Sequence, residues 1–80
     1  MRRPPELGHA QAQYYYAQML QKGHGVQRSL TGAHDWFLKA AEAGVKDAMR
    51  SLAIIYELGL GVPADAGKGK LWDERAKQVR

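Results

Sequence analysis

The chain has 80 residues, carries 12 lysines and arginines against 8 aspartates and glutamates for a net charge of +4, and is 45% hydrophobic. A chain of this length buries only roughly 60% of its unfolded surface, so these values predict one small globular domain and exclude a multidomain enzyme. The absence of cysteine excludes thiolate nucleophiles, iron–sulfur clusters and thiolate zinc sites. No apolar run reaches the ~18 residues of a membrane span, and residues 1–6 do not lead into an apolar signal segment, so we expect a cytoplasmic protein without membrane contacts.

The sequence repeats with a period of 36 residues and without gaps. Eight pairs of identical residues share this register, which indicates a repeated structural unit. They are Gly8 and Gly44, Ala12 and Ala48, Ala17 and Ala53, Gly23 and Gly59, Gly25 and Gly61, Val26 and Val62, Trp36 and Trp72, and Ala40 and Ala76. The period places one unit at about residues 8–43 and a second at about 44–79. Residues 3–8 also align with residues 39–44, which predicts the remnant of a preceding unit.

The first unit predicts two helices. Apolar residues at helical spacing place the first helix at about residues 9–22. Its expected buried residues are Ala12, Tyr16, Met19 and Leu20. Gly23 can close this helix in the left-handed conformation, and Ser29 is placed to cap a second helix at about residues 30–43. The expected apolar face of the second helix consists of Ala33, Trp36, Phe37 and Ala40.

The second unit predicts the same pair of helices, at about residues 46–58 and 68–78. The expected buried face of its first helix consists of Ala48, Leu52, Ile55 and Tyr56. Gly59 closes that helix, and Asp65 is the expected N-cap of the last one. Gly67 and Gly69 each lose roughly 1 kcal/mol of helix propensity relative to alanine, so we expect the last helix to start late or to fray. No segment alternates with the period of a strand, so the predicted fold class is all-α, with two αα-hairpins stacked as a short right-handed solenoid.

The repeated residues also form recognisable motifs. The first unit reads Ala10-x-Ala12-Gln13-Tyr14, Gly23-x-Gly25-Val26 and Ala33-x-x-Trp36-x-x-Lys39-Ala40-Ala41-Glu42-x-Gly44. The second unit reads Leu52-Ala53-x-x-Tyr56-x-x-Gly59-x-Gly61-Val62, with Trp72 and Ala76 following at the same spacing. These motifs resemble the Sel-1-like repeat family, a relative of the tetratricopeptide repeat, and the resemblance covers about residues 8–79.

The resemblance implies a single domain over residues 1–80 that is a superhelical scaffold. Members of this family mostly assemble other macromolecules, in bacterial signalling, envelope and secretion systems or in eukaryotic degradation complexes, and are seldom catalysts. The resemblance therefore implies an adaptor that binds a protein or peptide. Lys77 stands where the first unit has Ala41, which places a charge on the face that would pack against a further unit and predicts a capping helix.

The sequence offers no catalytic or metal-binding arrangement. The glycines around His24 follow a predicted helix, whereas a phosphate-binding loop precedes one, so they are expected to form a turn. The three histidines, His9, His24 and His34, lack the spacing and neighbours of a metal site, and we expect His34 to be solvated. Asp73 and Glu74 are adjacent and so point ~100° apart on a helix, which does not suit paired acid–base catalysis. We expect no enzyme activity, no cofactor and no metal.

Two alternative functions remain open at this point. The net charge of +4 is compatible with non-specific binding of nucleic acid, although the positive residues do not form a stripe, so we do not expect a nucleic-acid partner. A small hydrolase is the other alternative. Two units are also fewer than the three or so that usually make such an array self-sufficient, which favours a homodimer through the open edge of the first hairpin.

Helical spacing and repeat equivalence predict the positions of the aromatic residues. Trp36 and Trp72 are expected in the core, together with Tyr16. Tyr14 is expected to face outward, and Tyr15 either covers the open end of the stack or contacts a partner.

One polar stripe on the first helix of each unit is the expected binding surface. Its members are Gln11, Tyr14, Gln18 and Gln21 in the first unit and Asp47, Arg50, Ile54 and Glu57 in the second. In related helical-repeat scaffolds this stripe lines the concave surface, so the resemblance implies a shallow groove there. The predicted partner-binding residues are Tyr14, Gln18, Gln21, Arg50, Ile54 and Glu57, with Tyr14 and Ile54 as apolar anchors.

Overall fold

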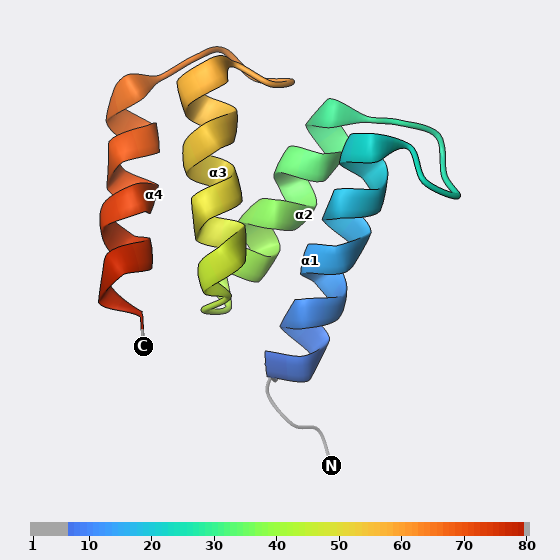
Figure 1. Ribbon diagram of the computed structural model, residues 1–80, viewed down its shortest axis with the longest axis horizontal. Helices are drawn as coiled ribbons and strands as arrows, with labels where there is room; N and C mark the ends of the chain where they lie inside the picture. Colours follow the sequence, from blue (N-terminus) through green and yellow to red (C-terminus); the bar gives the residue numbers. More distant parts are fainter. Residues whose placement is uncertain (1–6, 80) are drawn as a thin grey trace.

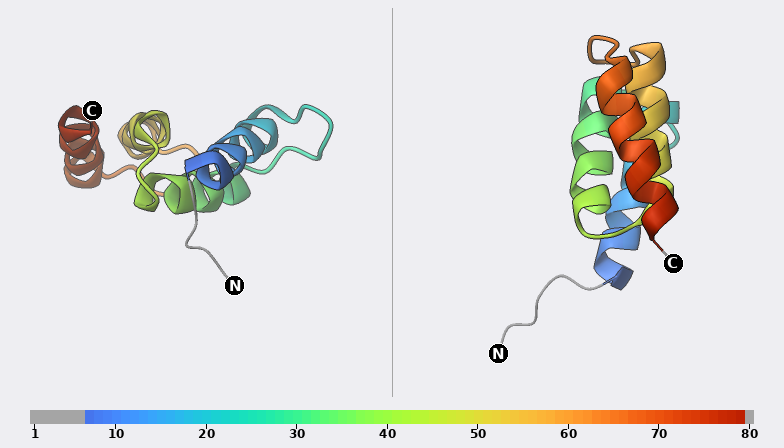
Figure 2. Two further views of the ribbon diagram at one scale, coloured as in Figure 1. Left: turned by 90° about the horizontal axis from the view of Figure 1, so that it is seen from below. Right: turned by 90° about the vertical axis from the view of Figure 1, so that its left-hand side faces the viewer.

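The computed structural model describes residues 7–79, which form four α-helices and no strand. The helices are α1 (Leu7–Lys22), α2 (Leu30–Glu42), α3 (Lys46–Leu58) and α4 (Ala66–Gln78). Each helix packs on the next, so that α1 with α2 and α3 with α4 form two hairpins that meet between α2 and α3. The four helices lie in chain order in a zigzag row, with α1 and α4 at opposite ends (Figures 1 and 2). The predicted all-α repeat architecture is confirmed.

The helix starts follow from the predicted caps. The Ser29 hydroxyl oxygen accepts a 3.0 Å hydrogen bond from the Gly32 backbone N–H at the start of α2. The Asp65 carboxylate accepts the equivalent bond of 3.1 Å from the Lys68 backbone N–H in α4. These bonds satisfy N–H groups that the first helical turn leaves without partners.

The prediction that the last helix starts late is wrong, because α4 begins at Ala66, directly after its cap. The reason lies in Gly69, which is buried where α4 approaches α3. A Cβ atom at Gly69 would lie 3.1 Å from the carbonyl oxygen of Ala53, closer than most side chains tolerate. The glycine therefore permits close packing of the two helices, which offsets its unfavourable helix propensity.

The two glycine turns have matching geometry. Gly23 and Gly59 close α1 and α3 with φ angles of 76° and 72°, in the left-handed region that glycine occupies without strain. Gly61 is also at positive φ, and a Cβ atom there would lie 2.7 Å from the carbonyl carbon of Leu30. The turn of the second unit thus rests directly on the backbone at the start of α2.

The core consists mainly of the facing sides of α2, α3 and α4. The predicted core residues of the second unit are confirmed as buried, and they are Ala48, Leu52, Ile55, Tyr56 and Trp72. Phe37 of α2 is fully buried beside them, with Ala33 and Ala40. Trp36 was predicted in the core but is only partly buried. Its ring meets the partly exposed Tyr16 ring of α1 edge-on, with the two centroids 5.2 Å apart.

The predicted buried face of α1 is confirmed only at Leu20. Tyr16 and Met19 are 38% and 39% exposed, and Ala12 is also exposed. The buried face of α1, which packs on α2, holds Ala10 and Ala17 beside Leu20. The prediction assumed that α1 has the same neighbours as α3, but α3 packs against α2 as well as α4, whereas α1 packs mainly on α2.

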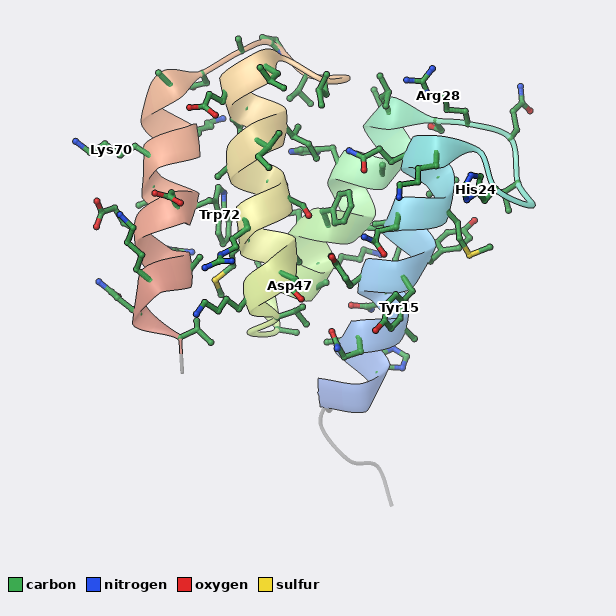
Figure 3. All side chains as sticks on the ribbon, viewed as in Figure 1. Tyr15, His24, Arg28, Asp47, Lys70 and Trp72 are labelled. Carbon is green, nitrogen blue, oxygen red and sulfur yellow. The ribbon has the colours of Figure 1, made fainter. Side chains whose placement is uncertain are left out.

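The neighbouring tyrosines also differ from the prediction. Tyr14 was expected to face outward but is partly buried, with its ring 5.7 Å from that of Phe37. Tyr15 is 55% exposed on the surface of α1 (Figure 3). Within residues 7–79, no helix is both long and apolar enough to cross a membrane.

Candidate functional site

A groove of about 490 Å³ lies between α3 and α4. Its lining residues come from one face of each helix and are Arg50, Ala53, Ile54 and Glu57 of α3 and Ala66, Gly69, Lys70 and Asp73 of α4. Gly69 allows α4 to approach α3 closely at Ala53, and the three small residues Ala53, Ala66 and Gly69 place no long side chain in the groove. The groove therefore follows from the spacing of side chains along two adjacent helices.

The apolar residue of the groove with the largest exposed side chain is Ile54. Its side chain is 50% exposed, although isoleucine is among the residues most often buried in proteins. It follows Arg50 by one helical turn and lies one turn before Glu57, so the apolar side chain is flanked by opposite charges along α3. This arrangement of an apolar centre with a polar rim is typical of surfaces that bind other proteins.

Charges of both signs also come from α4. Lys70 points outward at the free edge of the helix row (Figure 3). Asp73 forms an ion pair of 3.6 Å with Lys77 one turn further along α4. Among residues 9–79, no ion pair joins Arg50, Glu57 or Lys70 to another side chain. The groove thus combines two positive and two negative side chains, which suits a partner of mixed charge and not a polyanion.

The predicted partner-binding residues fall into two groups. Arg50, Ile54 and Glu57 come together in the groove between α3 and α4. Tyr14, Gln18 and Gln21 lie on α1 and do not line this groove. The stripe predicted as one surface is therefore divided in the structure between α1 and the groove.

Tyr14 has polar partners on two helices. Its hydroxyl oxygen accepts a 3.1 Å hydrogen bond from Nε2 of Gln18. Burial is the main cause that raises the pKa of the Tyr14 hydroxyl, and the Asp47 carboxylate on α3 raises it further, while a hydrogen bond with Ser51 lowers it. Tyr14 therefore belongs to the contact between the first and second units, and only part of its surface is left for a partner.

His34 has a role that the sequence analysis missed. It was expected to be solvated, but its Nε2 atom lies 2.7 Å from the Tyr56 hydroxyl oxygen, and a hydrogen bond joins α2 to α3 there. The Nδ1 atom of the same ring lies 3.2 Å from the Asp35 carboxylate. The repeat partner of His34 is Lys70, so repeat equivalence gave no signal of this contact. Within the described residues there is also no group of three or more side chains suited to hold a metal.

Comparison with known proteins agrees with this architecture. The model of the Sel1 repeat matches residues 10–45 and 46–77. No curated protein sequence matches the chain.

Solved structures with the same fold include a Sel1 repeat protein from Oxalobacter formigenes, at a TM-score of 0.84 and 32% sequence identity over 86% of this chain and 28% of that one. Another is c5321, a protective antigen of uropathogenic Escherichia coli strains displaying an SLR fold, at a TM-score of 0.85 and 30% identity over 89% of this chain and 15% of that one. The chain thus spans less than a third of either relative. Both repeat matches and both structures place the protein in one family, and the chain belongs to the Sel1 repeat family.

Proposed function

We propose that the chain is a protein–protein interaction module and that the groove between α3 and α4 binds a helix or peptide of the partner. The Sel1 repeat is a helical scaffold that generally mediates contacts between proteins. The observation that carries the proposal is the half-exposed Ile54 in a groove whose rim carries both charge signs. Binding surfaces concentrate their energy in such apolar anchors, and charged rims orient the partner.

Each groove residue has a distinct part in this proposal. Ile54 receives an apolar side chain of the partner, because burying it removes apolar area from water. Arg50 and Lys70 pair with acidic groups, while Glu57 and Asp73 pair with basic groups or backbone N–H donors. These pairs fix the direction of the bound segment more than they add affinity, because exposed ion pairs are screened by water.

The α1 half of the predicted stripe has a secondary part. Tyr14, Gln18 and Gln21 belong to α1 and do not line the groove, so only a partner that extends beyond the groove reaches them. We retain them as contacts for a partner longer than the groove. We also propose that the module is not an enzyme, in keeping with the scaffold nature of the Sel1 repeat fold.

A selection followed by matched variants tests this function. Peptides selected from a displayed random library against the chain are measured by calorimetry against Ile54→Ala and against Leu71→Ala. Leu71 lies on α4 outside the groove and is 50% exposed, as Ile54 is, so the two variants lose similar exposed apolar surface. We expect Ile54→Ala to weaken binding by about fivefold or more, which corresponds to roughly 1 kcal/mol, and Leu71→Ala to leave it unchanged. Equal affinity for both variants rules out the groove as the binding site.

A further inference from the structure

We propose that this chain associates head to tail with copies of itself, with α1 of one copy seated in the groove between α3 and α4 of the next. This inference rests on the proposed binding role of the groove and names its occupant. It follows from the contact that the two units already make within one chain, because the second copy would continue the same stacking.

Within one chain, α3 packs on a surface formed by α1 and α2. His34 of α2 is hydrogen-bonded to Tyr56 of α3 at 2.7 Å. Phe37 of α2 is completely buried, and the backbone of Leu30 lies directly against Gly61 in the turn after α3. These contacts define the receiving surface of the first unit.

The groove is the receiving surface of the second unit. A shift by the 36-residue period converts the α2 residues Leu30, Ala33, His34 and Phe37 into Ala66, Gly69, Lys70 and Asp73. The same shift converts the α1 residues Tyr14, Ala17, Gln18 and Gln21 into Arg50, Ala53, Ile54 and Glu57. All eight converted positions line the groove. The surface that α3 occupies in the first unit therefore recurs as an open groove in the second.

The buried face of α3 has an equivalent on α1, which we call the inserting face. In α3 this face includes Ala48, Leu52 and Ile55, which are 0%, 0% and 1% exposed. The shift converts them into Ala12, Tyr16 and Met19 of α1. In α1 all three positions are exposed, and Tyr15 beside them is 55% exposed. The chain thus carries an uncovered apolar and aromatic face on α1 and its receiving groove between α3 and α4. Helices α1 and α4 lie at opposite ends of the row (Figure 1).

Polar contacts in the first unit indicate which polar residues would contact each other where two copies join. Within the chain, Tyr14 has Asp47 and Ser51 as polar neighbours on α3. In the joint between copies the corresponding residues are Arg50 on one side and Gln11 and Tyr15 on the other. An arginine guanidinium fits both an amide oxygen and the face of a tyrosine ring, so the charge of Arg50 has suitable partners there.

One difference between the two units weakens the contact between copies. Asp73 takes the place of the fully buried Phe37, so the groove lacks the large aromatic side chain that anchors α3 in the first unit. Burying the Asp73 carboxylate also costs desolvation energy. The association between copies is therefore weaker than the contact between units, and it is reversible and dependent on concentration.

This geometry differs from the homodimer through the open edge of the first hairpin that the sequence favours. The two faces are unlike and belong to different parts of the row, one to α1 and the other to α3 and α4, so each joined copy keeps one face for a further copy. Such head-to-tail contacts generate open chains or rings, whereas a two-fold contact stops at a dimer.

Two variants that each block one face test the inference. Ala12→Glu places a charge at the centre of the inserting face, where its equivalent Ala48 is fully buried, while Ala12 itself is exposed and tolerates glutamate in a helix. Ile54→Glu blocks the groove, and Leu71→Glu is the control at equal exposure outside it. Sedimentation velocity is recorded from about 10 µM to about 1 mM, the range in which weak contacts populate.

The result expected below arises only if the inserting face of one copy binds the groove of another. The parent chain and Leu71→Glu form assemblies larger than a dimer as the protein concentration rises. Ala12→Glu and Ile54→Glu each remain monomeric. An equal mixture of the two blocked variants forms a dimer and stops there, because it contains one intact groove and one intact inserting face. Circular dichroism melts verify that both variants remain folded.

Two other results overturn the inference. A dimer that Ala12→Glu abolishes and Ile54→Glu preserves identifies a two-fold contact through α1. A parent chain that stays monomeric throughout, together with a mixture that does not dimerise, excludes self-association. In that case a selected peptide that still requires Ile54 leaves the groove as a site for a different protein, so failure of this inference is distinguished from failure of the proposed function.

Discussion

The Tyr56 hydroxyl oxygen lies 2.7 Å from Nε2 of His34, and the rings meet edge-on with centroids 5.4 Å apart. The two residues are 22 positions apart and belong to different units, so this contact joins the hairpins through α2 and α3. A partly buried hydrogen bond between helices both stabilises the interface and fixes the register of one helix on the other.

Removing this hydrogen bond is expected to destabilise the protein modestly. Tyr56→Phe keeps the ring and loses the hydroxyl, so we expect the free energy of unfolding to fall by about 0.5 to 1.5 kcal/mol. Tyr15→Phe, which removes the hydroxyl of an exposed tyrosine, is the control and is expected to have no measurable effect. Urea denaturation of both variants, with His34→Ala and the double variant, measures the coupling between the two side chains. A coupling of zero would assign no stabilising role to the hydrogen bond.

The turn glycines allow a prediction that separates backbone conformation from packing. Gly25 and Gly61 occupy equivalent positions with φ angles of 79° and 83°, so alanine is strained at both, by about 1 to 2 kcal/mol. A Cβ atom at Gly61 also meets the backbone of Leu30 at 2.7 Å, whereas the nearest atom to one at Gly25 is the flexible end of Met19 at 3.8 Å.

We therefore expect Gly61→Ala to lower the free energy of unfolding by about 1 to 3 kcal/mol more than Gly25→Ala does, because backbone atoms cannot move aside as a side chain can. Thermal and urea unfolding of the pair provide the comparison. Equal losses would mean that the turn of the second unit does not press on α2.

The stability of the protein is expected to fall at alkaline pH through Tyr14. Burial, and secondarily the Asp47 carboxylate, raises the pKa of Tyr14 in the folded state above its ordinary value of about 10. The folded state therefore holds the phenolic proton more tightly than the unfolded state does. The resulting stabilisation is complete below the ordinary pKa and is lost as the pH rises through the folded pKa.

Tyr14→Phe removes this contribution, so the difference in unfolding free energy between parent and variant is expected to shrink or reverse as the pH rises above about 10. Urea denaturation at a series of pH values from neutral upward measures it. Tyr15→Phe corrects for general alkaline effects, since Tyr15 is exposed. A difference that does not change with pH would contradict the assigned protonation preference.

Restoring the aromatic residue of the first unit to the groove is expected to strengthen self-association. Asp73→Phe supplies the side chain that Phe37 provides beneath α3, and burying a phenylalanine is worth about 1.5 to 3 kcal/mol. We expect the dissociation constant between copies to fall by about tenfold or more. Adding Ala12→Glu to the same chain is expected to cancel the gain, whereas non-specific aggregation through the new phenylalanine would persist. Sedimentation velocity distinguishes these results.

Local signals were sufficient to predict most of the fold. Ser29 and Asp65 precede their helices as caps, and Gly23 and Gly59 end theirs, because capping and positive φ are properties of a few neighbouring residues. The repeat period then supplied the pairing of the hairpins. The buried face of α3 was also correct, since that helix has neighbours on both sides.

The faces of α1 could not be predicted in the same way. Equivalent residues of the two units share the same apolar pattern. The pattern does not show whether a neighbouring helix covers these residues in each unit. Tyr16 and Met19 therefore carry a core pattern and remain exposed, while Tyr14 is partly covered by contact with the second unit. Long-range surroundings decide these cases.

The same limit applies to the candidate site. Arg50, Ile54 and Glu57 were predicted together because they lie on one helix at spacings of three and four residues. The contribution of Lys70 and Asp73 from α4 was missed, because it depends on how two helices meet. Lys70 and Asp73 are the repeat equivalents of His34 and Phe37, which lie on the surface of the first unit that receives α3. They could be identified from the sequence only after that surface was known.

The contact of Gly61 with the backbone of Leu30 has a consequence for how such arrays vary. At this point the second hairpin rests on the first through main-chain atoms, so the spacing of the two hairpins there depends on backbone dimensions. Substitutions on the exposed faces of the helices do not alter this main-chain contact, so the chemistry of the surface can change while the spacing of the hairpins at this point is kept.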